Sequence, residues 1–211
     1  MPRKELMAKI CSQQIVGVVR EDSADDASQV ADAYAKHGIR ILEITLTTPD
    51  AFDLIATITK RYAGDDVTIA AGTVRSSNDA AMARRAGAEV IVSPHTDVRV
   101  IEYANENDML VIAGAATATE VIRALGGPDY IRALRGPIRD VPLLAGGPVT
   151  LDAIEGYLDA GCVAVNLGVF LAVPDLVRMK QWEEIGRRVI LATSIVHSRK
   201  NASPAESAYI H

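Results

Sequence analysis

The chain has 211 residues, of which 49% are hydrophobic and 4% aromatic, and it carries a formal net charge of −5 at pH 7. A chain of this length can bury a substantial core as one globular domain, which we expect over residues 1–197, with a polar tail over 198–211. An acidic chain lacks the basic surface that binds nucleic acid or an anionic membrane, so neither is an expected partner.

Short apolar strands alternate with amphipathic helices along the chain. An N-terminal helix is predicted over Pro2 to Gln13. Later helices are predicted from Ser23 or Asp25 to His37, from Pro49 to Tyr62, after a cap at Ser76 or Ser77, and from Thr150 to Asp159. The predicted strands begin near seven residues: Val16, Ile41, Val67, Val90, Met109, Leu143 and Val163. A strand followed by a helix, five times in succession, indicates a parallel sheet with right-handed crossovers.

Small residues follow the carboxyl ends of the predicted strands. These are Gly72, Gly114, Gly146, Gly147 and Gly168. A TIM-type (β/α) barrel uses such positions to let a ligand approach the backbone. A doubly wound sheet would instead carry a glycine-rich phosphate loop after its first strand, where this chain has Arg20-Glu21-Asp22-Ser23. The sequence therefore predicts an α/β fold of the TIM-barrel type.

One acid lies inside a predicted buried strand, Ile41 to Leu46. A carboxyl group in such a strand either faces a polar pocket or costs several kcal/mol. Glu43 is therefore either a general acid/base or an interior acid that Arg20, at the end of the first strand, neutralises. The two roles are compatible, and the pattern leaves both open.

Metal chemistry and export are both disfavoured. Cys11 and Cys162 lie far apart without metal-type spacing, which suits buried thiols in a reducing cytoplasm. No signal peptide and no apolar run near 18 residues are apparent, so we expect a soluble cytoplasmic protein. His95 and Glu43 would be the only metal ligands near the mouth of the barrel, and two ligands make a poor site.

Six segments resemble one family of aldolases, those that act on 2-keto-3-deoxy-6-phosphogluconate (KDPG) and 2-keto-3-deoxy-6-phosphogalactonate. They occur in the family's order: Ile41-Leu42-Glu43-Ile44-Thr45-Leu46, Ala71-Gly72-Thr73-Val74, Ile91-Val92-Ser93-Pro94, Gly114-Ala115-Ala116-Thr117-Ala118-Thr119-Glu120, Gly127-Pro128-Asp129-Tyr130-Ile131-Arg132-Ala133-Leu134 and Ala145-Gly146-Gly147-Pro148-Val149. The resemblance implies a homotrimeric barrel without a cofactor. Its enzymes cleave a phosphorylated keto sugar acid to pyruvate and glyceraldehyde 3-phosphate through a lysine Schiff base.

The resemblance also implies roles for single residues. Glu43 matches the glutamate that moves protons. Arg20 matches an arginine that the galactonate branch uses for the substrate carboxylate, and Thr73 matches a hydroxyl near the same group. The expected substrate-binding residues are thus Arg20, Thr73, Pro94, Gly146, Gly147 and Gly168, and the expected ligand is a phosphorylated keto acid or pyruvate.

The chain departs from the family where the Schiff-base lysine is expected. The segment Thr119 to Ala124 runs directly into Leu125-Gly126-Gly127, so a strand carrying that lysine is missing. Its six lysines are all predicted in helices, near helix ends or in the tail: Lys4, Lys9, Lys36, Lys60, Lys180 and Lys200. Two smaller departures are Thr47, where the gluconate branch has arginine, and Val169, where the family commonly has a phosphate-binding serine.

Three hypotheses follow for function. The chain is an impaired or inactive relative of class I aldolases, a non-catalytic barrel that binds a keto acid or phosphate, or, as the weakest alternative, a metal-assisted lyase. The segment between Ala124 and Pro142 contains no apolar strand of four residues. We therefore expect a barrel without its sixth strand, open at that point, less stable than a full barrel and dependent on contacts between subunits.

Overall fold

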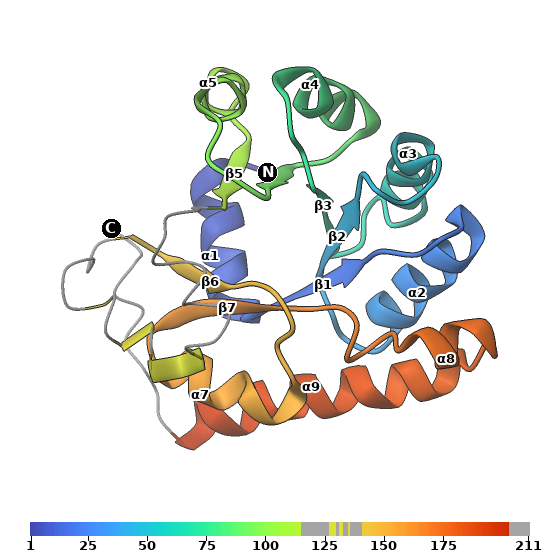
Figure 1. Cartoon of the computed structure of the whole chain (residues 1–211), viewed down its shortest axis with the longest axis vertical. Helices are drawn as coiled ribbons and strands as arrows, with labels where there is room; N and C mark the ends of the chain where they lie inside the picture. The colour runs from blue at the N-terminus through green and yellow to red at the C-terminus, as the bar shows by residue number, and fades with distance from the viewer. Residues whose placement is uncertain (115–126, 130, 133–134, 136–140, 203–211) are drawn as a thin grey trace.

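A computed structural model describes residues 1–114, 127–129, 131–132, 135 and 141–202. Seven parallel strands form one curled sheet in the order β5-β4-β3-β2-β1-β7-β6 (Figure 1). The strands are β1 Ile15–Val19, β2 Ile41–Thr45, β3 Thr68–Gly72, β4 Val90–Ser93, β5 Leu110–Ala113, β6 Leu143–Ala145 and β7 Cys162–Leu167. All seven strands predicted from the sequence are confirmed, and each begins within one residue of its predicted start.

Most helices surround the sheet on its convex side, whereas helix α1 lies against its interior (Figure 1). Their bounds are α1 Arg3–Gln13, α2 Ala24–Lys36, α3 Ala51–Arg61, α4 Ser77–Ala86, α5 Val98–Glu106, the 3-10 turn η1 Leu151–Ala153, α7 Ile154–Asp159, α8 Pro174–Arg178 and α9 Trp182–Ala202. Every helix in the described ranges is too short or too polar to cross a membrane.

Side-chain hydroxyls begin two of the outer helices. Ser23 Oγ accepts a hydrogen bond from the Asp26 N–H at the start of α2, and Ser76 Oγ accepts one from the Asp79 N–H at the start of α4, each over 3.1 Å. These bonds satisfy donors that a helix leaves free in its first turn. Asp50 stands at the N-cap of α3 in a left-handed conformation and makes no such bond with its side chain.

The sheet separates two hydrophobic clusters. On the inside, Leu6 and Ile10 of α1 pack against alternate strand residues, which are Val16, Ile41, Ala70, Val90, Leu110 and Ala164. Because side chains alternate between the faces of a strand, the residues between these point outward, toward the helices. Helix α1 therefore closes the amino-terminal end of the sheet, and the opposite end is left for ligands.

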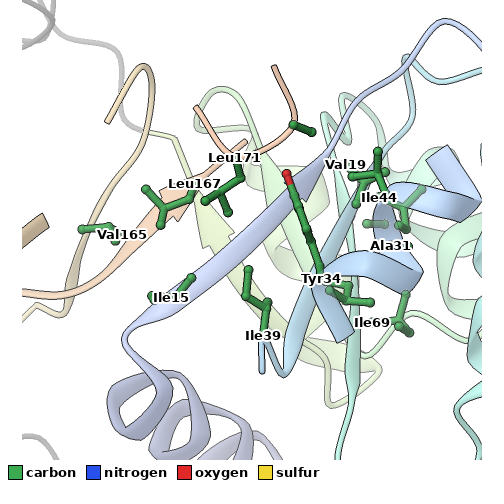
Figure 2. Close-up of a cluster of buried hydrophobic side chains, with 14 of the residues drawn as sticks. Ile15, Val19, Ala31, Tyr34, Ile39, Ile44, Ile69, Val165, Leu167 and Leu171 are labelled. Carbon is green, nitrogen blue, oxygen red and sulfur yellow. The ribbon is translucent and has the colours of Figure 1, made fainter. Parts of the chain in front are cut away.

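The outer cluster fixes the spacing between β1 and α2. Tyr34 is fully buried there and stands against β1, among Ile15, Val19 and Ile39 (Figure 2). A side-chain carbon at Gly17 would lie 2.7 Å from the Tyr34 ring, so β1 needs a glycine at that point. The Tyr34 hydroxyl donates to the carbonyl oxygen of Gly168, over 3.3 Å, and this bond ties α2 to the segment after β7.

The two sheet edges lie on either side of the least described part of the chain. In the described residues β5 and β6 each pair with one strand, and residues 115–126, 130, 133–134 and 136–140 between them are outside the description. The predicted absence of a sixth strand between Ala124 and Pro142 falls largely on those residues and stays a prediction. The described residues 127–129, 131–132 and 135 are helical.

The last helix extends beyond the expected tail boundary. Helix α9 continues to Ala202, so the boundary expected at Ser198 falls within a helix. Arg199 Nε donates to Asp159 Oδ1 over 2.7 Å, and Lys200 Nζ donates to the carbonyl oxygen of Ser12. These contacts hold the last turns of α9 against α7 and the end of α1. The helix therefore extends through polar residues at its end.

Candidate active site

The carboxyl ends of the strands bring Glu43 into the interior of the curled sheet. Ile41 belongs to the inner cluster, and Glu43, two residues later on β2, faces the same side. Val18 of β1 and Ala70 of β3 are its register partners on the two sides. The strand period therefore places a carboxyl group where the next inward layer of the barrel would otherwise be apolar.

Glu43 is buried, with 4% of its surface exposed. The side-chain amide of Asn166 on β7 donates to Glu43 Oε2 over 3.1 Å. Burial raises the pKa of Glu43 to about 7, although the positive charge of Arg20 and the Asn166 hydrogen bond both act to lower it. A carboxyl group with this pKa holds and releases a proton near neutral pH, as a general acid/base must.

Gly72 makes room for the Glu43 side chain. A side-chain carbon at Gly72 would lie 2.2 Å from Glu43 Oε1 and 2.8 Å from its Cδ, far inside contact distance. Gly72 is also the register partner of Thr45 at the end of β3. Any larger residue at this position would force either the carboxyl group or β3 to move.

Arg20 and Thr73 meet at the mouth of the sheet. Arg20 follows β1, and its Nη2 donates to Thr73 Oγ1 over 3.3 Å. Thr73 follows β3 with a φ of 59°, a left-handed conformation that β-branched residues rarely adopt. Strain of this kind persists where surrounding structure imposes it and is often found at binding sites. The strained backbone presents the hydroxyl to the guanidinium group.

A cavity of about 430 Å³ opens beside Glu43. The described residues that line it come from the ends of β1, β2, β6 and β7 and from the start of α8: Val18, Arg20, Glu21, Glu43, Gly147, Pro148, Asn166, Gly168, Val169, Ala172 and Pro174. Arg20 is the one cationic side chain among them. The volume suits a small organic ligand, and a single cation suits one carboxylate.

Four of the seven predicted site residues share this cavity, namely Glu43, Arg20, Gly147 and Gly168. The other three, Thr73, Pro94 and Gly146, are not among its described lining residues. Of these, Thr73 contacts the lining residue Arg20. Pro94 instead packs against the turn after β5, where a side-chain carbon at Gly114 would lie 2.4 Å from the Pro94 carbonyl oxygen. A side-chain carbon at Gly146 would meet no described atom within 4 Å.

Two polar residues of the cavity were not predicted from the sequence. Asn166 was expected only as part of a strand, although an amide at an inward position of a buried strand is the same signal that singled out Glu43. Glu21 was expected only in a turn. It is half buried, and burial, together with Asp26 and Asp22, raises the pKa of Glu21 to about 7.

All six lysines of the sequence lie in the described residues, and each is outside the strands. Lys4 and Lys9 are in α1, Lys36 ends α2, Lys60 is in α3, Lys180 follows α8 and Lys200 is in α9. Lys9 forms an ion pair with Asp66 over 2.7 Å and donates to Thr68 Oγ1, at the closed end of the sheet. None of the six is among the described residues that line the cavity.

The described residues contain no group of three or more His, Cys, Asp and Glu that could hold a metal ion. The pair considered from the sequence, Glu43 and His95, therefore gains no third ligand from this part of the chain. At the end of β4, Ser93 Oγ donates to the His95 carbonyl oxygen over 2.7 Å.

Comparison with known proteins gives a consistent result over most of the chain. The family model described as "Aldolase: KDPG and KHG aldolase" matches residues 6–188. A 2-dehydro-3-deoxy-phosphogluconate aldolase of Haemophilus influenzae is 27% identical over 201 residues, covering 88% of this chain and 94% of the relative. A 2-dehydro-3-deoxy-6-phosphogalactonate aldolase of Escherichia coli is 32% identical over 169 residues, covering 73% of this chain and 82% of the relative.

A solved structure has the same fold. The crystal structure of KDPG aldolase from Legionella pneumophila, with pyruvate captured as a covalent carbinolamine intermediate, superposes with a TM-score of 0.76. The superposition covers 88% of this chain and 96% of that chain, at 22% sequence identity. At that identity the likeness concerns the fold: a curled parallel sheet with helices outside it.

Proposed function

The chain belongs to the KDPG and KHG aldolase family, and we propose that it binds a small 2-keto acid such as pyruvate without completing the Schiff-base reaction of class I aldolases. The cavity beside Glu43 supports the binding half of this proposal, because it offers one guanidinium group for one carboxylate. The positions of the six lysines support the other half. The absence of a lysine beside Glu43 is the single observation that carries the proposal.

The chemistry explains why a missing lysine matters. A 2-keto acid releases a proton from C3, or breaks the bond beyond it, only when the carbonyl carbon becomes an electron sink, and a protonated imine supplies that sink. An imine-forming amine must be neutral, desolvated and close to the carbonyl. Glu43 has the proton-transfer character that the reaction needs, but proton transfer contributes only part of the rate enhancement. We therefore propose that carbon–carbon cleavage is impaired or lost while binding persists.

The runner-up is an active class I aldolase that uses one of the six lysines. Sodium borohydride with isotope-labelled pyruvate separates the two, because borohydride reduces an imine to a stable secondary amine. We expect no mass adduct on the intact chain, while the Haemophilus influenzae relative, treated in parallel, provides the positive control. An adduct on any lysine of this chain would overturn the proposal.

Binding is measured separately from chemistry. Isothermal titration measures the dissociation constant for pyruvate. We expect it to rise about tenfold or more in Arg20→Gln, because the variant lacks one charge-assisted hydrogen-bond donor. Arg85→Gln, in the exposed last turn of α4, is the matched control and should leave the constant unchanged. Failure of pyruvate to bind the unmodified chain would remove the binding half of the proposal.

We also propose that the chain assembles as a cytoplasmic homotrimer, which the family resemblance implies. Ile190 and Leu191 on α9 expose 49% and 52% of their surfaces, and an interface between copies could cover such side chains. The two cysteines of the chain, Cys11 and Cys162, form no disulfide with each other, as suits a reducing compartment. Light scattering of the purified chain tests the trimer, and a monomeric mass at micromolar concentration would contradict it.

A further inference from the structure

The two carboxyl oxygens of Glu43 have different surroundings. Oε2 accepts the hydrogen bond of the Asn166 amide over 3.1 Å, whereas Oε1 accepts none from a described residue. Oε1 lies against Gly72, where the lack of a side chain leaves space for it. Glu43 also lines the cavity, so its carboxyl group can meet a ligand there. The Asn166 hydrogen bond thus fixes the carboxyl group through one oxygen and leaves the other free to take a proton.

Arg20 lies one layer nearer the mouth of the cavity than Glu43. Val18 is the register partner of Glu43, and Arg20 follows Val18 by two residues, which places it on the same face of the chain. Two residues advance a strand by about 6–7 Å. All three side chains line the cavity. A three-carbon 2-keto acid is of the right size to contact both the guanidinium group and the carboxyl group at once.

The guanidinium group of Arg20 can bind a 2-keto acid through two oxygens. Its Nη2 donates to Thr73 Oγ1 over 3.3 Å, which holds the group at the mouth of the cavity. A guanidinium group has five N–H donors in one plane, so donors remain for a ligand. In a planar 2-keto acid one carboxylate oxygen and the keto oxygen lie side by side, and a fork of two N–H groups matches them. The keto oxygen then faces a positive charge, and C3 is left free to approach Glu43.

Removal of a proton from C3 needs a base and an electron sink. A keto group is a weaker sink than a protonated imine, but a cationic donor on its oxygen strengthens it, because negative charge develops on that oxygen. The pKa of Glu43, about 7, makes its carboxylate more basic than an ordinary one while part of it stays ionised near neutral pH. Arg20 and Glu43 thus supply the sink and the base, and neither role needs a lysine.

We propose that the chain enolises a bound 2-keto acid without forming an imine. Glu43 Oε1 takes a proton from C3, the electron pair of that C–H bond forms a C2–C3 double bond, and the carbonyl π pair moves to the keto oxygen, where Arg20 holds the enolate. Return of a proton from Glu43 to C3 regenerates the keto acid. Because the Glu43 proton exchanges with water in between, the net result is hydrogen exchange at C3, and no carbon–carbon bond breaks. This activity rests on the proposed binding of a 2-keto acid and adds a reaction to it.

Proton NMR of pyruvate in D2O measures this activity as loss of the methyl signal. At saturating pyruvate and near neutral pD, we expect the unmodified chain to exchange the methyl protons, and Glu43→Gln to lower the rate about 100-fold or more, the usual share of a general base. Glu43→Asp keeps a carboxylate on a shorter side chain, so its rate should fall between the two. Glu102→Gln removes a carboxylate at an exposed position of α5 and should leave the rate unchanged. Circular dichroism verifies that each variant folds.

Isothermal titration and borohydride treatment of the same samples separate this inference from the proposed function. Pyruvate binding without exchange, or exchange that survives Glu43→Gln in a folded variant, would overturn enolisation by Glu43 and leave the binding proposal in place. Absence of pyruvate binding would instead overturn the proposed function beneath it. Exchange accompanied by a borohydride adduct on a lysine would reveal imine chemistry and contradict both.

Discussion

Asn166 Nδ2 lies 3.1 Å from Glu43 Oε2 and donates a hydrogen bond to it, while Oδ1 of the same amide is buried with no hydrogen-bond partner among the described residues. Leaving a buried acceptor unpaired costs free energy, so packing must hold the amide with its donor toward the carboxyl group. Asn166 belongs to β7 and Glu43 to β2, with β1 between them. The contact therefore reaches across a strand and joins two walls of the cavity.

Removing this donor should make Glu43 harder to ionise. In Asn166→Ala the carboxylate loses a hydrogen bond that favours its charged form, so the pKa of Glu43 should rise further. The pH titration of 13C-labelled glutamate side chains by NMR measures the shift. Asn78→Ala, at an exposed position of α4, is the control and should leave the Glu43 midpoint where it is. An unchanged midpoint in Asn166→Ala would show that the contact has no electrostatic effect.

The raised pKa of Glu43 predicts how stability depends on pH. Its pKa is about 7 when folded and near 4.5 when unfolded, so between these values the folded state holds the extra proton. The contribution of Glu43 to the free energy of unfolding should therefore fall as pH rises from 4.5 through 7. Glu43→Gln has no titrating group at this position. Its free energy of unfolding minus that of the unmodified chain should therefore be about 3 kcal/mol larger at pH 8 than at pH 4.5. Urea denaturation of both proteins at pH 4.5 and pH 8 measures this difference. The same dependence of stability on pH in the two proteins would contradict the prediction.

Gly72→Ala should disturb the carboxyl group directly. The new carbon would lie 2.2 Å from Glu43 Oε1, so either the side chain or β3 must move, at a cost of about 1–3 kcal/mol. Gly146→Ala is the matched control for stability, because a carbon there would meet no described atom within 4 Å. In thermal and urea unfolding, Gly72→Ala should be clearly less stable than Gly146→Ala. Equal stability would mean that Glu43 readily adopts another position.

The left-handed backbone at Thr73 predicts an unusual order of stability. Thr73→Ala and Thr73→Gly both remove the hydroxyl that Arg20 contacts, but only glycine enters a φ of 59° without steric cost. We expect Thr73→Gly to be more stable than Thr73→Ala by about 1 kcal/mol. At Thr150, where φ is −82°, the same two replacements should give the opposite order. Alanine as the more stable residue at both positions would rule out strain at Thr73.

Restoring a lysine strand tests the role of Glu43 in chemistry. The corresponding segment of the Haemophilus influenzae relative, inserted between Ala124 and Leu125, should confer aldolase activity on a chain that we expect to lack it. Glu43→Gln in the restored chain should then lower kcat by about 10²–10⁴, the usual contribution of general acid/base catalysis. Coupled detection of released pyruvate measures both. A restored chain that is active and indifferent to Glu43→Gln would make Glu43 structural.

Most of the fold was predictable because strand and helix periods are strong signals. The runs at Ile15, Ile41 and Val90 are apolar and short, and each is followed by a helix with a polar or small residue at its start. The extent of α9 was not predictable, because its last turns are polar and depend on Asp159 and Ser12, which lie far away in the sequence. The local sequence pattern does not indicate partners that lie so far away in the chain.

The site was predictable only in part for a similar reason. Glu43 was predicted because a charge in a buried strand is conspicuous, and Arg20 because it ends the first strand. Asn166 is uncharged and Glu21 sits in an acidic turn, so each resembles an ordinary residue of its element. Their importance comes from the curvature of the sheet, which brings β7 and the residue after β1 to the same cavity.

The contact between Glu43 and Asn166 joins residues separated by 123 positions, and this has a consequence for synthesis. A ribosome adds about 5–20 residues per second, so roughly 6 to 25 s pass between the two residues. Through that interval β1 lacks β7 as its neighbour, and the Glu43 carboxyl group remains hydrated. The emerging chain therefore exposes one unpaired edge of β1 with an ionised acid on the neighbouring strand, and the nascent protein depends on its last third to complete the cavity.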